Sequence, residues 1–230
     1  NYLEILYALY SPGVLPVIDV VRSDCDGSAL SPMPEAYTLD GDWVDSYFCG
    51  QLRYGIAFSV CNKLYSLQTI REEHIGFLQE LSIGEDMLFV FEYLHHCRSI
   101  RFSKDASYHY TIAPGSAMLS SRDYTHPYEK TFGVMSEKGR FPLPIADRTL
   151  SRWAFDASII IIANPFIIDR NYAEFKKWWR EFCRTALYRA AVASEKPSGY
   201  KRRVLHFALQ SENMIAIYVL FRLLRFGKKK

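Results

Sequence analysis

The apolar run from Met87 to Leu94 (MLFVFEYL) is the feature that most limits how this chain can fold. Its apolar residues lie on nearly every side of a helix, and a helix of that kind has to be buried within the protein. The chain has 230 residues, of which 49% are hydrophobic and 23% charged, as is ordinary for a folded soluble protein. We therefore expect at least one sizeable domain with this run as a core helix.

The first half of the chain alternates between helix and strand signals. Tyr2 to Tyr10 has apolar residues at helical spacing, and Pro12-Gly13 ends that helix. Val14 to Val21 is almost entirely apolar and predicts a strand buried on both faces, followed by a polar loop over residues 22–36. Further elements are expected as a short helix closed by Gly50 within residues 40–50, a strand at 56–60, a helix at 66–74 and a strand at 107–112.

The second half is expected to be mainly helical. Residues 121–148 are polar and weakly patterned, and we assign no element to them. A helical stripe follows, a break at Pro197-Ser198-Gly199 comes next, and a second helix runs from there to Phe226; the stripe consists of Phe175, Trp178, Trp179, Phe182, Ala186 and Leu187. The sequence thus divides into residues 1–120, a connecting region at 121–164 and a basic helical extension at 165–230.

Charge is distributed unevenly along the chain. Residues 1–164 carry 13 basic and 20 acidic residues, a net charge of −7, whereas residues 165–230 carry 15 and 5, a net charge of +10. On charge alone, a basic extension suits an anionic partner, such as a lipid surface or nucleic acid, or is a solvated basic helix face. The apolar part, Met214 to Phe226, is interrupted by Arg222 and Arg225 and is too short to span a bilayer, so residues 214–230 fit either a helix lying in a membrane interface or a packed helix with a solvated basic end.

The cysteines give no sign of a metal site or a disulfide framework. The five of them show no CxxC spacing and are odd in number: Cys25, Cys49, Cys61, Cys97 and Cys183. A reducing cytoplasm fits this pattern best.

The strongest local signal for chemistry is Gly84-Glu85-Asp86, at the start of the expected core helix. The unpaired N–H groups and the positive dipole end of a helix stabilise an ionised carboxylate there, and such a carboxylate can accept a proton. Acidic residues at helix starts are also common as simple caps. The position alone leaves both readings open.

Three ordered segments resemble the bacterial family 2 glycosyltransferases that build capsule, O-antigen and exopolysaccharide. Asn62-Lys63-Leu64-Tyr65 resembles the family's N-K-L-Y, and Gly84 to Phe89 resembles its x-E-D-x-L-F. Tyr108 to Met118 resembles Y-x-Y-R-I-x-x-x-S-x-M. Two residues depart from the family pattern: Thr111 stands where the family often has Arg, and Cys61 stands where it often has Trp. The resemblance covers about residues 56–119.

The resemblance implies an α/β fold of the GT-A (nucleotide-diphospho-sugar transferase) type and an inverting, hexosyltransferase-like enzyme. Asp86 would be the base that deprotonates the acceptor hydroxyl, with Glu85 beside it. Substrate contacts would come from Asn62, Lys63, Tyr110 and Ser116. The partners would be a nucleotide-sugar donor and a saccharide or lipid-linked acceptor, with a second copy of the chain also expected and no nucleic acid. The place would be the cytoplasm, at the inner face of the membrane.

The family's N-terminal strand and its acidic motif for Mg²⁺ or Mn²⁺ are not evident, so the chain is expected to be the acceptor-side portion of a longer enzyme. Such a cation needs carboxylates alongside the donor phosphates. Asp24-Cys25-Asp26 and Asp40-Gly41-Asp42 match D-x-D only as strings, because Asp and Gly are frequent in turns. His109 and His126 are weak candidates for metal ligands, because a lone histidine is more often packed or exposed without binding a metal.

Two other functions fit the sequence less well. A non-catalytic domain that keeps this fold and binds a glycan, a membrane or a partner is the main alternative. A glycoside hydrolase is disfavoured, because neighbours on a helix such as Glu85 and Asp86 point about 100° apart and would not flank one glycosidic bond.

Overall fold

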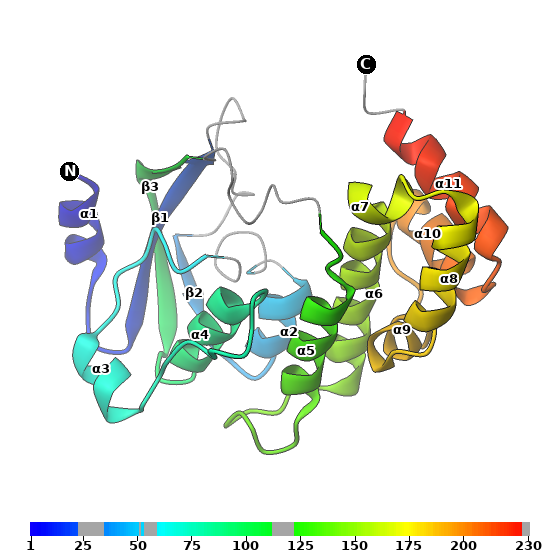
Figure 1. Cartoon of the computed structure of the whole chain (residues 1–230). Coiled ribbons are helices and arrows are strands. Elements are labelled where there is room, and N and C mark those ends of the chain that lie inside the picture. The colour runs from blue at the N-terminus through cyan, green and yellow to red at the C-terminus, as the bar shows by residue number, and fades with distance from the viewer. Residues whose placement is uncertain (23–34, 51, 53–58, 112–121, 227–230) are drawn as a thin grey trace. The chain divides into compact units, whose positions relative to one another are not determined.

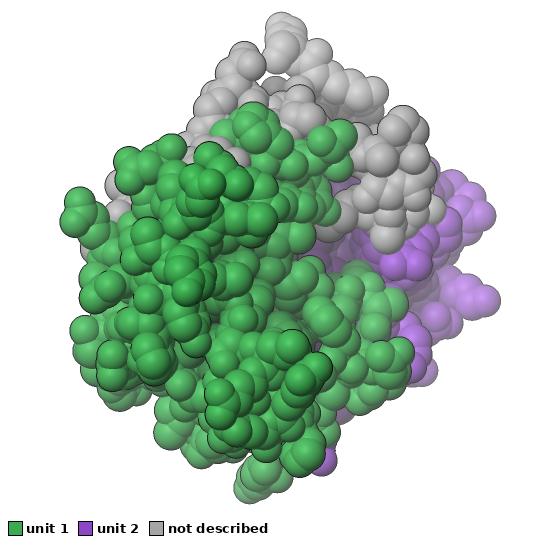
Figure 2. All heavy atoms as spheres, turned by 90° about the vertical axis from the view of Figure 1, so that its left-hand side faces the viewer, with its two compact units in different colours: residues 1–119, 138–145 green, residues 120–137, 146–230 purple. Residues whose placement is uncertain are grey.

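The computed structural model describes residues 1–22, 35–50, 52, 59–111 and 122–226. Within it the residue contacts define two compact units. Unit 1 comprises Asn1–Leu119 and Lys138–Ile145, and unit 2 comprises Ser120–Glu137 and Ala146–Lys230 (Figure 2). Each unit is described by itself below.

Unit 1 is a mixed α/β unit built on a three-stranded sheet in the order β1-β3-β2. β1 and β3 run parallel, as Figure 1 shows, and β2 pairs with β3 in the antiparallel sense. Its elements in chain order are α1 (Tyr2–Leu9), β1 (Val14–Arg22), β2 (Ala36–Thr38), α2 (Trp43–Cys49), α3 (Leu67–Glu72), α4 (Glu85–Leu94) and β3 (Ser99–Tyr110).

The expected strand at residues 14–21 is confirmed as β1, and its side chains from Val14 to Asp19 are buried. Gly13, with φ of +73°, makes the turn from α1 into this strand. The register against β3 shifts between Ile18 and Asp19, which marks a bulge in the ladder. Burial of both faces explains why the run is apolar throughout.

The expected helices of unit 1 are confirmed as α1, α2, α3 and α4, and Gly50 is the residue that ends α2. The expectation of a loop throughout residues 22–36 was wrong at both ends, because Arg22 still belongs to β1 and Ala36 begins β2. Residues 23–34 lie outside the described part. Of the strand expected at 56–60, only Ser59 and Val60 are described, and they are not in a strand. β3 begins at Ser99, eight residues before the strand expected from the sequence.

The core of unit 1 is an aromatic cluster around α4. Phe91 is fully buried. Its ring contacts those of Trp43, Tyr47 and Phe48 from α2, His95 just after α4, and Phe141. The prediction that Met87 to Leu94 forms a core helix is thereby confirmed, and every residue of the run except Glu92 is buried.

The described residues of unit 2 form helices joined by turns and short irregular segments, with no strand among them. The connecting region 121–164, of which residues 121–148 were assigned no element from the sequence, holds α5 and α6. The helices are α5 (Thr125–Ser136), α6 (Asp147–Ala163), α7 (Pro165–Ile168), α8 (Tyr172–Phe182), α9 (Ala186–Val192), α10 (Tyr200–Gln210) and α11 (Met214–Phe226). No helix of the described residues is both long and apolar enough to cross a membrane.

The stripe predicted over residues 175–187 is buried except at Ala186, which is exposed. It belongs to two helices, because the chain turns between Phe182 and Ala186. The single helix expected up to Phe226 was also wrong. Glu212, with φ of +52°, separates α10 from α11, and the side chain of Asn213 accepts a hydrogen bond from the backbone of Ala216 to begin the second helix.

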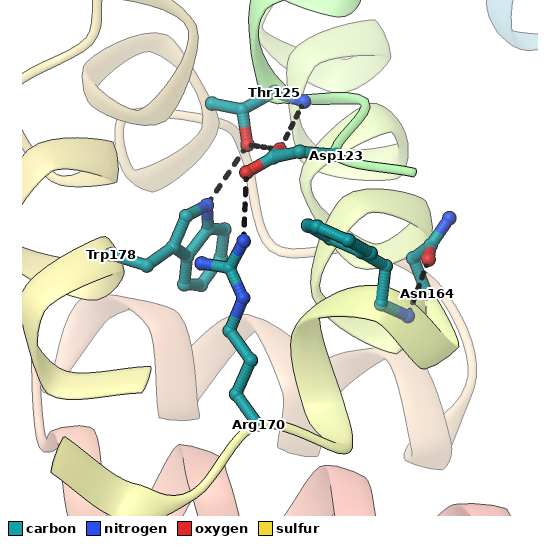
Figure 3. A network of polar contacts seen from close by, with 6 residues as sticks. Asp123, Thr125, Asn164, Arg170 and Trp178 are labelled. Carbon is teal, nitrogen blue, oxygen red and sulfur yellow. Dashed lines mark hydrogen bonds and ion pairs between the residues drawn. The ribbon is translucent and has the colours of Figure 1, made fainter. Parts of the chain in front are cut away.

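A polar network joins distant segments of unit 2 (Figure 3). The guanidinium of Arg170 lies 3.4 Å from the carboxylate of Asp123, and the indole N–H of Trp178 donates to the hydroxyl of Thr125 at 3.0 Å. The hydroxyl of Tyr218 donates to the backbone carbonyl of Arg170 at 2.9 Å. These contacts hold α8 and α11 together with the first residues of α5.

Replacing Phe91 with Ala should lower the free energy of unfolding by about 3–5 kcal/mol, because it leaves a cavity in the middle of the α4 cluster. Urea unfolding followed by tryptophan fluorescence would measure the change, and Trp43, whose ring lies 5.3 Å from that of Phe91, contributes to the signal. Leu67→Ala on exposed α3 is the matched control and should change stability by about 0.5 kcal/mol or less. Equal effects of the two substitutions would contradict the assignment of this core.

Candidate functional site

Asp86 lies in the first turn of α4, where Gly84 leads into the helix with φ of +83°. A residue with a side chain adopts that backbone conformation only with strain, so glycine suits this turn. The carboxyl of Asp86 is half-buried and accepts a hydrogen bond from the backbone of Val60. A carboxylate at a helix start is also stabilised by the helix dipole. The side chain is thus held by α4 on one side and by residue 60 on the other.

The pKa of Asp86 is raised above its ordinary value. Burial is the main cause, and the neighbouring carboxylate of Glu85 adds to it. The hydrogen bond from Val60 and the positive charge of Lys63 act in the opposite sense. A carboxylate that is raised in pKa but still ionised near neutral pH is a better proton acceptor than a solvated one.

Residues 59–65 run along β1 and bring Val60 to the start of α4. Asn62, with φ of +59°, exchanges two hydrogen bonds with Ile18: its side-chain amide donates to the Ile18 carbonyl at 2.5 Å, and its own carbonyl accepts from the Ile18 N–H at 3.0 Å. Lys63 forms a β-bridge with Val17, and the N–H of Leu64 donates to the carbonyl of Pro16. Asn62 is only 3% exposed, so its amide is occupied within the protein.

The ammonium group of Lys63 lies in a cage of three acceptor oxygen atoms, which belong to Ser59, Cys61 and Asn62. It donates to the carbonyls of Ser59 at 2.6 Å and Cys61 at 3.3 Å, and to the side-chain oxygen of Asn62 at 2.9 Å. Burial lowers the pKa of Lys63 to about 7, and Cys61 and Asp86 oppose that shift. All three N–H donors therefore have partners, and the side chain fixes the shape of residues 59–63.

Two tyrosines near Asp86, the buried Tyr47 and the partly buried Tyr65, are not among the candidates predicted from the sequence. The hydroxyl of Tyr65 donates to the carbonyl of Val60 at 3.3 Å, and that of Tyr47 donates to the carbonyl of Met87 at 2.5 Å. Burial raises the pKa of both phenols, and the negative charge of Asp86 raises both further. Tyr65 closes the N-K-L-Y motif and could have been noticed there, whereas nothing in the sequence marks Tyr47.

Asp19 is a buried carboxylate that was not predicted as a site residue from the sequence. It is 5% exposed, lies in β1 at the register shift and accepts a hydrogen bond from the N–H of Val20 at 2.7 Å. A single Asp within an otherwise apolar strand was the available signal. Its position directly after Ile18 places it one residue from the pairing with Asn62.

The structure brings four of the six sequence candidates together: Glu85, Asp86, Asn62 and Lys63. Tyr110 is the last residue of β3, half-buried and paired in register with Arg22, and no described contact joins it to Asp86. Ser116 lies outside the described residues. The substrate-binding roles of all these residues stay predictions.

The described residues contain no group of three His, Cys, Asp or Glu side chains that could hold a metal ion. Asp40 and Asp42 are exposed in the turn before α2, and His109 and His126 are exposed in different units. Asp24 and Asp26 lie outside the described part. The acidic motif for Mg²⁺ or Mn²⁺ was expected upstream of this chain, and that site stays a prediction.

No protein-family model and no curated protein match the chain. Solved structures do: the crystal structure of Staphylococcus aureus TarS 1-349 in complex with UDP-GlcNAc matches with a TM-score of 0.54 and 16% identity over 98% of this chain. TarS 1-349 alone matches with a TM-score of 0.55 and 15% identity over 99%, and TarS with 0.53 and 15% over 96%. The chain therefore has a fold similar to that of TarS.

The chain spans only part of these neighbours. It covers 61–62% of the TarS 1-349 chains and 36% of the longer TarS chain.

Replacing Lys63 with Met should destabilise unit 1 by roughly 1–3 kcal/mol, because three acceptor oxygens lose their shared donor. Urea unfolding would measure the loss. Lys104→Met, on an exposed position of β3, makes the same substitution without breaking such a cage and should cost about 0.5 kcal/mol or less. A Lys63→Met variant as stable as the control would show that the cage contributes nothing.

Proposed function

We propose that the protein carrying this chain is a glycosyltransferase that moves a sugar from a nucleotide-sugar donor to a saccharide or lipid-linked acceptor. The main support is the fold shared with TarS, one structure of which contains UDP-GlcNAc and another UDP. The identity of 15–16% supports the fold and leaves the donor base and sugar open. The ordered resemblance to family 2 and to a GT-A layout adds the class of reaction.

In the proposed reaction, Asp86 accepts the proton of the acceptor hydroxyl as that oxygen attacks the anomeric carbon of the donor. The bond from the anomeric carbon to the donor diphosphate breaks, the nucleoside diphosphate leaves, and the configuration at that carbon inverts. One positioned base is what this displacement needs from the acceptor side. The half-buried carboxylate of Asp86, fixed by Val60, is the described group that suits the task.

The neighbours of Asp86 have different tasks in this proposal. Glu85 keeps the pKa of Asp86 raised and is available to a hydroxyl of the acceptor. Lys63 and Asn62 hold residues 59–63 in shape, so that the backbone of Val60 meets the carboxylate. Tyr110 and Ser116 are proposed at the acceptor side on the resemblance alone. A divalent cation, where the complete enzyme binds one, would neutralise the leaving diphosphate, and no described residue is assigned to it.

Asp86→Asn should lower kcat by about 10²–10⁴-fold, because the amide keeps the hydrogen bond from Val60 but cannot accept a proton. The measurement is release of nucleoside diphosphate by the complete protein with its donor and acceptor. Glu4→Gln, exposed on α1, is the control for loss of one carboxylate and should leave kcat unchanged. Unaltered transfer by Asp86→Asn would remove Asp86 from the mechanism, and absence of nucleotide-sugar binding by the wild type would favour a non-catalytic domain.

The acidic limb of the pH profile should follow the pKa of Asp86. Activity needs the ionised carboxylate, so it falls as pH drops through that raised pKa. Glu85→Gln removes the neighbouring negative charge, lowers the pKa of Asp86 and should move the acidic limb of kcat to lower pH, whatever the change in maximal rate. A limb that stays in place or moves to higher pH would contradict the coupling of these two carboxylates.

A further inference from the structure

α11 turns apolar side chains both inward and outward. Ile217 and Phe221 are buried, whereas Ile215 is 61% exposed and Leu223 65% exposed. Val219 lies between these two and is also exposed. Residues four apart share one face of a helix, so the three exposed side chains form a continuous stripe.

α10 has an outward apolar side of the same kind. His206, Ala208 and Leu209 are buried, and Phe207 is 73% exposed. Tyr200, two helical turns earlier on the same face, is also exposed. The exposed apolar residues of the two helices are called the outer set below: Tyr200, Phe207, Ile215, Val219 and Leu223.

Both helices carry only positive charges. Lys201 and Arg203 are exposed on α10, and neither α10 nor α11 contains an acidic residue. On α11, Arg222 directly precedes the exposed Leu223, and its guanidinium donates to the hydroxyl of Tyr218 at 2.7 Å. Glu212, in the turn between the helices, is the one acidic residue of positions 200–226.

We propose that the outer set docks onto the surface of an anionic lipid bilayer, with its apolar side chains at the boundary of the acyl chains and the basic residues among the headgroups. This goes beyond the proposed reaction and does not depend on it. An anionic bilayer matches both the apolar stripe and the positive charge. A second copy would bring two sets of basic residues together without acidic partners, which is unfavourable. A 13-residue helix is about 20 Å long and lies on the membrane rather than across it.

The test is co-sedimentation of the full chain with vesicles of phosphatidylglycerol and phosphatidylcholine, compared with vesicles of phosphatidylcholine alone. We expect binding to the anionic vesicles that weakens as salt is added. The double substitution Ile215→Ser and Leu223→Ser should reduce the partition coefficient by about tenfold or more. Lys201→Gln with Arg203→Gln should reduce binding to the anionic vesicles and flatten the dependence on salt.

Matched controls distinguish binding by the outer set from nonspecific binding of exposed apolar or basic residues elsewhere. Leu67→Ser on exposed α3 and the pair Lys177→Gln with Arg180→Gln on exposed positions of α8 should leave vesicle binding unchanged. Far-UV circular dichroism should show the same helix content in every variant. No binding to anionic vesicles, or binding that survives the double substitution, would overturn the proposal. The proposal would also be overturned if the chain self-associates in sedimentation velocity, the double substitution abolishes that self-association, and the wild type does not bind vesicles.

Discussion

The reciprocal hydrogen bonds between Asn62 and Ile18 hold residues 59–65 against β1, and the position of Asp86 depends on them. The cage around Lys63 begins at the same asparagine, whose side-chain oxygen accepts one of its three hydrogen bonds. That cage fixes Ser59 and Cys61, and Val60 between them reaches the carboxylate at the start of α4. Sheet, cage and helix start are therefore one connected structure, with the carboxylate at its end.

The elements predicted correctly from the sequence are those whose secondary structure is determined by their own residues. β1 and α4 are apolar on all sides, so burial leaves few alternatives, and Gly50 ends α2 through its backbone. The first half of β3 was missed although Ile100 and Phe102 alternate with the exposed Arg101, as in a half-buried strand. The signal was present there and was obscured by the charged residues that follow.

Other elements could not be read locally, because residues far along the chain decide them. The three residues of β2 show no period and form a strand only because β3 offers them an edge. α5 contains Pro127 and Gly133 and is weakly patterned, yet Thr125 at its start accepts a hydrogen bond from Trp178, 53 residues later. In the candidate site, the N-K-L-Y and E-D motifs indicated which residues gather, but only coordinates give the cage and the contact with Val60.

The raised pKa of Asp86 has a consequence for stability that opposes its proposed use. A carboxyl whose pKa is higher in the folded state binds its proton more tightly there, so its contribution to stability is greatest at low pH and is lost as pH rises through the folded pKa. Ionised Asp86, the form that accepts a proton, is thus the form that the fold tolerates less well. The hydrogen bond from Val60 and the charge of Lys63 reduce that cost. The same few residues therefore set both the basicity of the carboxylate and the stability of the fold that carries it.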